Sequence, residues 1–327
     1  VVVNGAVISN WDGEGHGPVR MLDIIKMSLN TGMVEIGLTA GKDVLSDYVR
    51  AFGFGKKTGM ELPGEGEGIL FKKEDMSPVD TATMSFGQGI AVTPLQMVQA
   101  MSAMVNGGTM VKPHIIKEID EPDGKQEITE TQEVGQPIKE STANTIRDMM
   151  EQEVSAGGGN NAMVKGYRFA GKTGTAQKLD TEHGGYIDGS YIASFIGFGP
   201  VDDARFIILI TVDTPTKGSI YGGQIAAPAF RDIASQLVRY MKISPNVRDK
   251  STKIAVARPI LPAPSTDITG KVNIPNFTGY TMGELRDWFL KANLGFRPEG
   301  LGNAVSQSVA PGTKVDPGTD ITVTFAR

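Results

Sequence analysis

The pattern of apolar and polar residues predicts a helix that begins after Thr93. Thr93 offers an N-cap hydroxyl, Pro94 suits the first helical position, and Gln96 completes a capping box. Apolar side chains then recur every three or four residues, at Met97, Val98, Met101, Met104 and Val105. Because glycine favours conformations outside the helix, Asn106-Gly107-Gly108 should end it.

Further along, the pattern predicts a sheet packed against helices. A second helix should begin at Ser141 and end in a flexible glycine stretch at 157–159, burying Ile146, Met149, Met150 and Val154. Residues 191–198 and 206–212 are nearly continuous apolar runs, so we expect two paired central strands covered on both faces. Helical spacing returns over 224–241, which predicts a helix across that sheet. This order indicates an α+β architecture.

The last part of the chain has a different pattern. From Ser244 to about Gly270 no period survives among Pro, Ser, Lys and Asp residues, which is typical of a linker. Beyond it, Thr281 and Glu284 form a capping box before an apolar helical face, with Gly295 expected as the C′ glycine. That face consists of Leu285, Trp288, Phe289 and Ala292, which we interpret as core packing rather than as a ligand site. The expected domains are 1–243 and 270–327, joined by a linker over 244–269.

Composition narrows the function classes. The chain has 327 residues, 40% of them hydrophobic, and a net charge of -5, which gives no reason to expect a nucleic-acid partner. It has no cysteine, which excludes disulfides, thiolate metal sites and cysteine nucleophiles. The three histidines have no second ligand at a metal-like spacing, so we expect neither a metal site nor a cofactor. No apolar run reaches the roughly 20 residues of a membrane span.

The most informative stretch is Lys172-Thr173-Gly174-Thr175. A lysine ammonium beside two hydroxyls can hold a carboxylate, and the glycine between them lets a substrate backbone approach an edge strand. The triplet alone is short, and a turn or a phosphate loop could produce it. Nucleotide binding is disfavoured because the upstream glycines of a Walker loop are missing.

A second motif, Ser28-Leu29-Asn30, lies far upstream. Taken alone, it reads as the polar end of a helix that contains Met21, Leu22, Ile24 and Ile25. Together with Lys172-Thr173-Gly174 it matches two of the three motifs of penicillin-recognising serine enzymes, in their usual order.

The surroundings extend this match. Stretches 85–89, 170–176 and 221–228 each resemble ones usual in class B penicillin-binding proteins, so the resemblance covers about Trp11 to Met241. The module after the linker is similar to a PASTA domain. The resemblance implies a penicillin-binding transpeptidase fold, in which an antiparallel sheet is flanked by helices, followed by a small α+β domain.

The resemblance also implies roles for these residues. The motif at 172–175 would bind the carboxylate of a substrate or β-lactam, with Lys172 keeping the site electropositive. Thr175 would add its hydroxyl, and its backbone N–H would serve the oxyanion hole. Ser28 would relay a proton towards the leaving D-alanine, and Asn30 would hydrogen-bond the substrate amide and orient the catalytic lysine.

One departure from the family pattern matters. No serine in the chain is followed three residues later by lysine, so the Ser-x-x-Lys nucleophile is missing. Family order places it upstream of Val1, together with a membrane anchor for an extracytoplasmic protein. We therefore expect a peptidoglycan D,D-transpeptidase, acylated by β-lactams, of which this chain alone is inactive.

Its expected partners are stem peptides, β-lactams, and divisional or sporulation cell-wall proteins. Two alternatives stay open at this point. One is a β-lactam sensor or β-lactamase-like protein, and the other is a non-catalytic cell-wall-binding scaffold.

Overall fold

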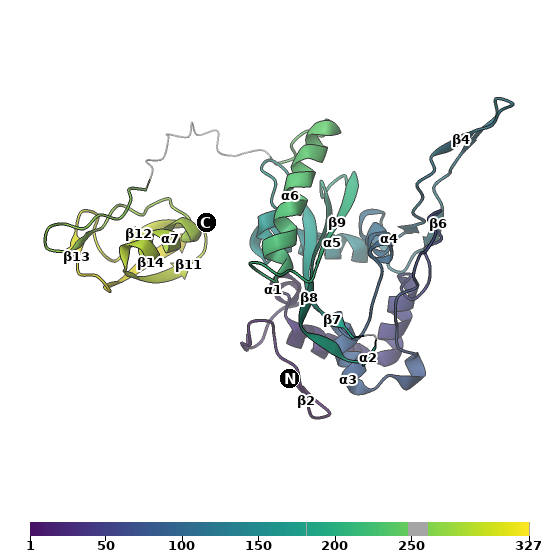
Figure 1. Ribbon diagram of the computed structural model, residues 1–327, viewed down its shortest axis with the longest axis horizontal. Helices are drawn as coiled ribbons and strands as arrows, with labels where there is room; N and C mark the ends of the chain where they lie inside the picture. Colours follow the sequence, from purple (N-terminus) through teal and green to yellow (C-terminus); the bar gives the residue numbers. More distant parts are fainter. Residues whose placement is uncertain (181, 248–260, 327) are drawn as a thin grey trace. The chain divides into compact units, whose positions relative to one another are not determined.

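The computed structural model describes residues 1–180, 182–247 and 261–326. Its contacts divide the chain into two units, Val1–Asp249 and Lys250–Arg327 (Figure 1). The expected linker at 244–269 stays a prediction, and its middle lies outside the described residues. Within the described part of the chain, no helix combines the length and the apolar character needed to cross a membrane.

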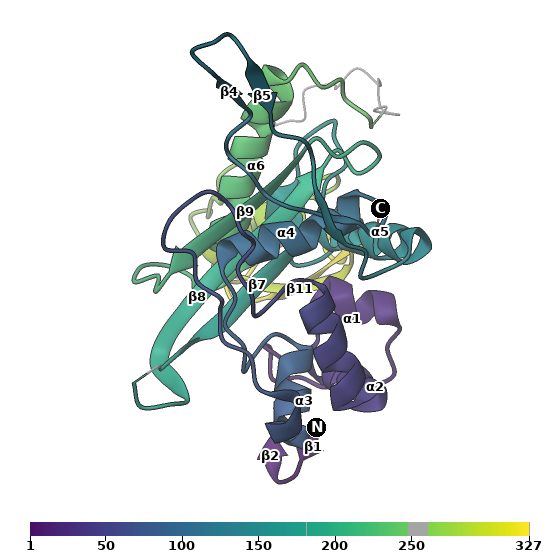
Figure 2. The same ribbon diagram turned by 90° about the vertical axis from the view of Figure 1, so that its right-hand side faces the viewer.

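The first unit is built around an antiparallel sheet of three strands in the order β7 (Ala170–Leu179), β8 (Tyr186–Gly199) and β9 (Phe206–Asp213). Helix α6 (Gly222–Tyr240) covers one face, while α4 (Pro94–Val105) and α5 (Glu140–Ala156) lie on the other, as Figures 1 and 2 show. The prediction of two central strands was wrong for β9, which lies at one edge of the sheet among the described strands.

Side-chain alternation in β8 explains why both faces are covered. Phe195 and Phe198 are each 0% exposed, and their odd and even positions direct them to opposite faces of the sheet. Phe195 packs with Phe230 of α6, whereas Phe198 packs with Met104 of α4 and Met150 of α5. A strand buried on both faces therefore reads as the continuous apolar run that the sequence contains.

The capping box of α4 is confirmed. The Thr93 hydroxyl accepts from the Gln96 N–H at 3.1 Å, and the Gln96 side chain accepts from the Thr93 N–H at 2.9 Å. Helix α5 instead begins one residue before Ser141 and follows Lys139, which gives no side-chain cap. The expectation that Ser141 starts this helix was therefore wrong by one residue.

The remaining elements of the first unit surround this sheet. Hairpin β1–β2 pairs Val2–Val3 with Ala6–Val7, and α2 packs against α3. The two-stranded hairpin β4–β5 projects away from the body in Figure 1. The bounds of the other helices and strands are α1 Met21–Met27, α2 Asn30–Ala51, η1 Lys73–Asp75, α3 Pro78–Ser85, β3 Met110–Val111, β4 Glu118–Asp120, β5 Gln126–Ile128, β6 Glu133–Gly135 and η2 Asn160–Ala162.

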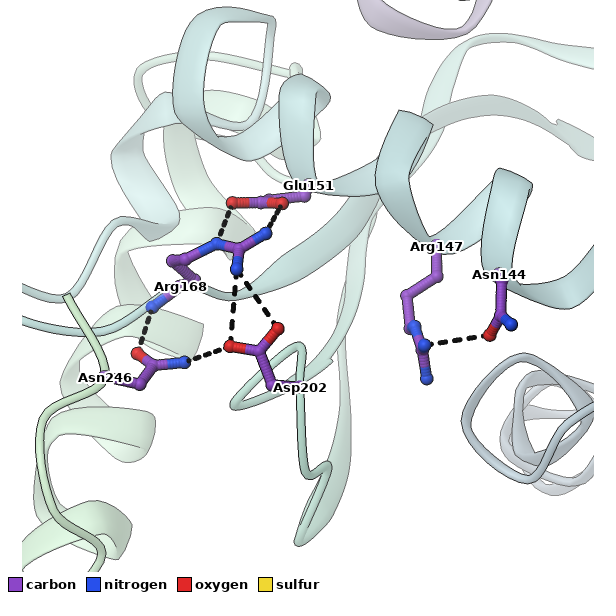
Figure 3. Close-up of polar contacts among 6 residues, drawn as sticks. All are labelled: Asn144, Arg147, Glu151, Arg168, Asp202 and Asn246. Atoms are coloured by element: carbon purple, nitrogen blue, oxygen red, sulfur yellow. Dashed lines mark hydrogen bonds and ion pairs between the residues drawn. The ribbon is translucent and has the colours of Figure 1, made fainter.

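A polar cluster holds the chain after α6 to this body (Figure 3). The Arg168 guanidinium donates to Glu151 of α5 and to Asp202 in the β8–β9 turn. The Arg168 N–H donates to Asn246, whose amide group donates to Asp202 at 3.1 Å. The two carboxylates raise the pKa of Arg168 above its usual value. Residues at the start of the expected linker are therefore bonded to the first unit.

The second unit has a core of its own. Helix α7 (Met282–Ala292) packs on a sheet in the order β11 (Gly295–Gly300), β14 (Asp320–Ala326), β12 (Asn303–Gln307), beside the pair β10 (Val272–Asn273) and β13 (Lys314–Val315). The packing role predicted for two aromatic residues is confirmed, because Trp288 is 5% exposed and Phe289 is 1% exposed. The expected C′ role of Gly295 was wrong, since Asn293 takes the left-handed conformation and Gly295 opens β11.

Candidate active site

Ser28 lies in a sharp turn between two helices. Helix α1 ends at Met27, and Ser28 has φ 57° and ψ 49°, a left-handed conformation that is uncommon outside glycine. The next residue, Leu29, is 2% exposed and precedes α2. The buried leucine fixes the turn, and the turn presents the Ser28 hydroxyl on the side of β7.

Lys172 reaches this hydroxyl from strand β7. Its Nζ lies 2.9 Å from Ser28 Oγ, which joins two motifs that are 144 residues apart in the chain. Nζ also lies 3.3 Å from both the carbonyl oxygen and the hydroxyl of Thr173. The Lys172 side chain is 28% exposed, so a ligand can approach it from the solvent side.

The strand motif continues into the beginning of α6. The Gly222 N–H, at the first residue of α6, donates to Thr175 Oγ1 at 3.2 Å. A Cβ on Gly174 would lie 2.5 Å from Ser194 Oγ of the neighbouring strand, so a side chain there would require the Ser194 hydroxyl to move. The hydroxyl of Thr175 therefore lies at a helix N-terminus, whose partial positive charge favours an anionic ligand.

Asn30 is the first residue of α2 and lies beside the Ser28 turn. Its side-chain amide donates to the Ser9 carbonyl at 3.1 Å and so ties α2 to the first ten residues. The predicted role of Asn30 toward a substrate amide stays a prediction.

Glu153 is a member of this site that the sequence reasoning missed. It comes from α5, is 0% exposed, and its Oε1 accepts from the Thr173 N–H at 3.2 Å and from Thr173 Oγ1 at 2.9 Å. The same oxygen lies 3.6 Å from Lys172 Nζ. A signal was present, because Glu153 is three residues after Met150 and falls on the apolar stripe of the helix.

Burial acts on both charges of this pair. It raises the pKa of the Glu153 carboxyl, whereas the nearby Lys172 charge lowers that pKa. Burial lowers the pKa of the Lys172 ammonium, whereas the nearby Glu153 charge raises that pKa.

The glycines that follow α5 close over Glu153. A Cβ on Gly159 would lie 2.2 Å from Glu153 Oε2, and one on Gly157 would lie 2.5 Å from the Lys26 carbonyl oxygen. This stretch was predicted to be flexible. The structure instead shows close approach of backbone to a buried carboxylate, which only residues without a side chain permit.

An aromatic pair borders the site, and it too was missed. Trp11 donates from Nε1 to the Met27 carbonyl at 3.0 Å, next to Ser28. Its ring meets that of Tyr221 edge-on with centroids 5.8 Å apart, and Tyr221 immediately precedes Gly222. Both rings are partly exposed, so they form an apolar rim between the Ser28 turn and the start of α6.

These elements bring a serine hydroxyl from a turn between two helices to a lysine and two threonines on one strand of a helix-covered sheet. Residues 2–235 match the family described as the penicillin binding protein transpeptidase domain, and residues 272–327 match the PASTA domain. The chain therefore belongs to the penicillin-binding protein transpeptidase family, with a PASTA domain after the transpeptidase unit.

Individual relatives agree with this assignment. The chain is 40% identical over 325 residues to Stage V sporulation protein D of Bacillus subtilis (strain 168), which is 98% of this chain and 48% of that protein. It is 33% identical over 245 residues to peptidoglycan D,D-transpeptidase FtsI of Escherichia coli (strain K12), which is 75% of this chain and 39% of the relative. The chain thus spans less than half the length of these curated relatives.

A solved structure gives the same result for the fold. A crystal structure of penicillin-binding protein 3 from Mycobacterium tuberculosis, complexed with ampicillin, superposes with a TM-score of 0.70 at 31% identity. The match covers 76% of this chain and 57% of that one. The transpeptidase fold and the family predicted from the motifs are confirmed.

Proposed function

We propose that the protein to which this chain belongs is a peptidoglycan D,D-transpeptidase that works through an acyl-serine intermediate. The observation that carries the proposal is the 2.9 Å contact between Lys172 Nζ and Ser28 Oγ, which joins the two motifs at one point of the fold. Relatives named peptidoglycan D,D-transpeptidase support it. Because the chain contains no Ser-x-x-Lys, the nucleophile must come from elsewhere in the whole protein.

The reaction has two acyl-transfer steps. The serine Oγ attacks the penultimate D-alanine carbonyl of a stem peptide, the C–N bond breaks, and D-alanine leaves with a proton. An amine of a second stem peptide then attacks the ester carbonyl, a C–N bond forms, the C–O bond to the serine breaks, and the serine oxygen takes up a proton that the amine gives up. A β-lactam would acylate the same serine by opening its ring.

The residues of this chain would bind and direct the reactants. The Lys172 ammonium and the hydroxyls of Thr173 and Thr175 suit the terminal carboxylate of a stem peptide or β-lactam, since charge-assisted hydrogen bonds are the strong ones. Ser28, in contact with Lys172, is suitably placed to pass a proton to the departing amine. Trp11 and Tyr221 would add an apolar surface at the rim.

Penicillin labelling tests this proposal. The whole protein, including its Ser-x-x-Lys segment, should gain one penicilloyl adduct by intact mass, and peptide mapping should place it on that serine. Lys172→Ala should slow the second-order acylation rate by at least about a hundredfold, the loss expected when one charge-stabilising donor is removed from a reaction site. Lys178→Ala is the matched control, because Lys178 lies on the same strand but pairs with Asp213 at the surface.

Other outcomes point to the alternatives. Rapid turnover of nitrocefin by the whole protein favours the β-lactamase-like function. Absence of any adduct contradicts the enzyme and favours the cell-wall-binding scaffold.

The remaining proposals concern location and partners. Stem peptides lie outside the membrane, so we propose an extracytoplasmic protein held by an anchor in another segment. A relative that covers both units of the chain is a sporulation protein, which supports sporulation cell-wall proteins as partners, with divisional ones as the alternative. Membrane fractionation of the penicillin-labelled protein checks the location.

A further inference from the structure

Glu153 is a buried carboxyl group for which the proposed reaction has no use. Its side chain is fully buried, and in the described residues its Oε2 has no hydrogen-bond partner. Burying a carboxylate is costly unless it is paired and hydrogen-bonded. Apolar packing of α5 alone would be better served by a leucine or methionine at this position, so the carboxylate needs another explanation.

The contacts of its second oxygen supply one. Glu153 Oε1 lies 2.9 Å from Thr173 Oγ1, 3.2 Å from the Thr173 N–H and 3.6 Å from Lys172 Nζ. It thus lies behind the two residues that would hold the substrate carboxylate, on the side away from solvent. The backbone of the glycine stretch at 157–159 packs closely against it.

Most other charged groups near this pair have partners of their own, as Glu151 does with Arg168. Of the elements that pack against α5, α4 and η2 contain no charged residue, and on β7 Lys178 pairs with Asp213. At α1, Asp23 pairs with Arg20 and Lys26. In α6, Arg231 pairs with Asp232, and Arg239 donates to the Ser235 carbonyl. Asp188 lies on the exposed part of β8. Glu153 is therefore the charge that acts on Lys172, and its burial leaves that action unscreened.

We propose that Glu153 is a positioning residue that keeps Lys172 protonated and aimed at Ser28, so that acyl transfer depends on a carboxylate that never touches the substrate. The inference rests on the proposed function, which supplies the reaction. It adds that the rate of acyl transfer at this site depends on pH through the Glu153 charge. With Glu153 ionised, the Lys172 ammonium keeps a donor on Ser28 Oγ and presents its charge to the incoming carboxylate. Without that negative charge, burial favours the neutral amine, which binds a carboxylate poorly.

The sign of the pH effect follows. An opposite charge within about 4–6 Å raises the pKa of an ammonium by about one to three units. Glu153→Gln keeps the shape and an acceptor for Thr173 but removes the charge, so the Lys172 pKa should fall further. The ammonium is then lost at lower pH, and the alkaline limb of the acylation profile should move to lower pH by about one unit or more.

The first experiment needs no acylation and uses the chain itself. With ¹³C,¹⁵N-lysine labelling, the Cε and Nζ shifts of Lys172 are followed against pH in the unaltered chain, Glu153→Gln and Glu151→Gln. Glu151 is the matched control, because it is on the same helix and pairs with Arg168 instead. We expect the Lys172 pKa to fall by about one unit or more only in Glu153→Gln. An unchanged Lys172 pKa in that variant overturns the proposal.

The second experiment uses the whole protein. The rate of penicillin acylation is measured against pH for the same variants, and the alkaline limb should shift only for Glu153→Gln. Lack of acylation in the unaltered protein defeats the proposed function, while the lysine titration still decides the role of Glu153.

A variant that keeps the charge separates this role from a purely structural one. If Glu153→Gln does not fold, Glu153→Asp in the folded chain should keep the Lys172 pKa close to its original value despite weaker contacts to Thr173. A fall of the Lys172 pKa by one unit or more in that folded variant contradicts the role of the charge.

Discussion

At the scale of single residues, this site depends as much on missing side chains as on reactive ones. Gly222 lets the start of α6 approach β7 so closely that its N–H reaches the Thr175 hydroxyl. A Cβ there would lie 2.1 Å from the Ser194 carbonyl oxygen and 2.4 Å from that of Gly174. Both obstacles are strand backbone, which cannot move aside as a side chain can.

Gly222→Ala should therefore destabilise the first unit by about 1–3 kcal/mol, the usual cost of overpacking. Chemical denaturation followed by circular dichroism measures the loss. Gly15→Ala is the control, since nothing lies within 4 Å of a Cβ at that position. Equal stability of the two variants contradicts the close approach.

The sequence predicts the reactive residues of the site better than their support. Lys172 and Ser28 stand out through motifs that have a chemical reason, and the family resemblance implied that both serve one site. Glu153 was missed because a glutamate in a helix is usually solvated, and only the position of the helix face in the fold makes it buried. Local spacing cannot report which of several polar residues the tertiary structure covers.

At the scale of elements, helix starts illustrate the same limit. The start of α4 can be predicted from the sequence, because the Thr93 and Gln96 side chains accept hydrogen bonds from backbone N–H groups of the first turn. The α5 start follows Lys139 with no such cap, so packing of the helix sets its beginning. Helix α2, Asn30–Ala51, was not predicted at all, because Gly32, Gly37 and Gly41 interrupt its pattern and Gly41 has non-helical angles.

Loss of a hydroxyl near the start of α4 should lower the unfolding free energy more than the same loss near the start of α5. Thr93→Ala should cost about 1 kcal/mol of unfolding free energy, typical of a lost N-cap. Ser141→Ala should stay within about 0.5 kcal/mol of the original, as exposed substitutions without a cap do. Urea titrations of both variants compare them, and a loss at Ser141 as large as that at Thr93 goes against this assignment.

At the scale of the whole molecule, the two units have separate cores and one tryptophan each. Trp11 of the first unit is 57% exposed, whereas Trp288 of the second is 5% exposed and donates to the Pro262 carbonyl at 2.7 Å. The composition shift near residue 244 indicated a linker between two domains, and its bounds stay a prediction. Within the second unit, the helix could be predicted from its capping box and the last strand from its alternating pattern, because both are visible in the sequence.

Trp11→Phe should leave a protein whose fluorescence is blue-shifted and reports only the second unit. Because each unit buries its own apolar residues, the Trp288 transition should keep its midpoint when Gly222→Ala is added to this variant. Thermal melts followed by fluorescence and by circular dichroism make the comparison. A matching downward shift of both transitions means that the units unfold together.

The projecting β4–β5 hairpin has a practical consequence. Its strand residues are exposed, and its turn around Gly124 joins only the two strands to each other. Since the chain has no cysteine, Asp123→Cys would create a single thiol on the hairpin turn. A fluorophore attached there would mark the transpeptidase unit without competing with natural thiols, which makes this hairpin a suitable position for distance measurements between the two units.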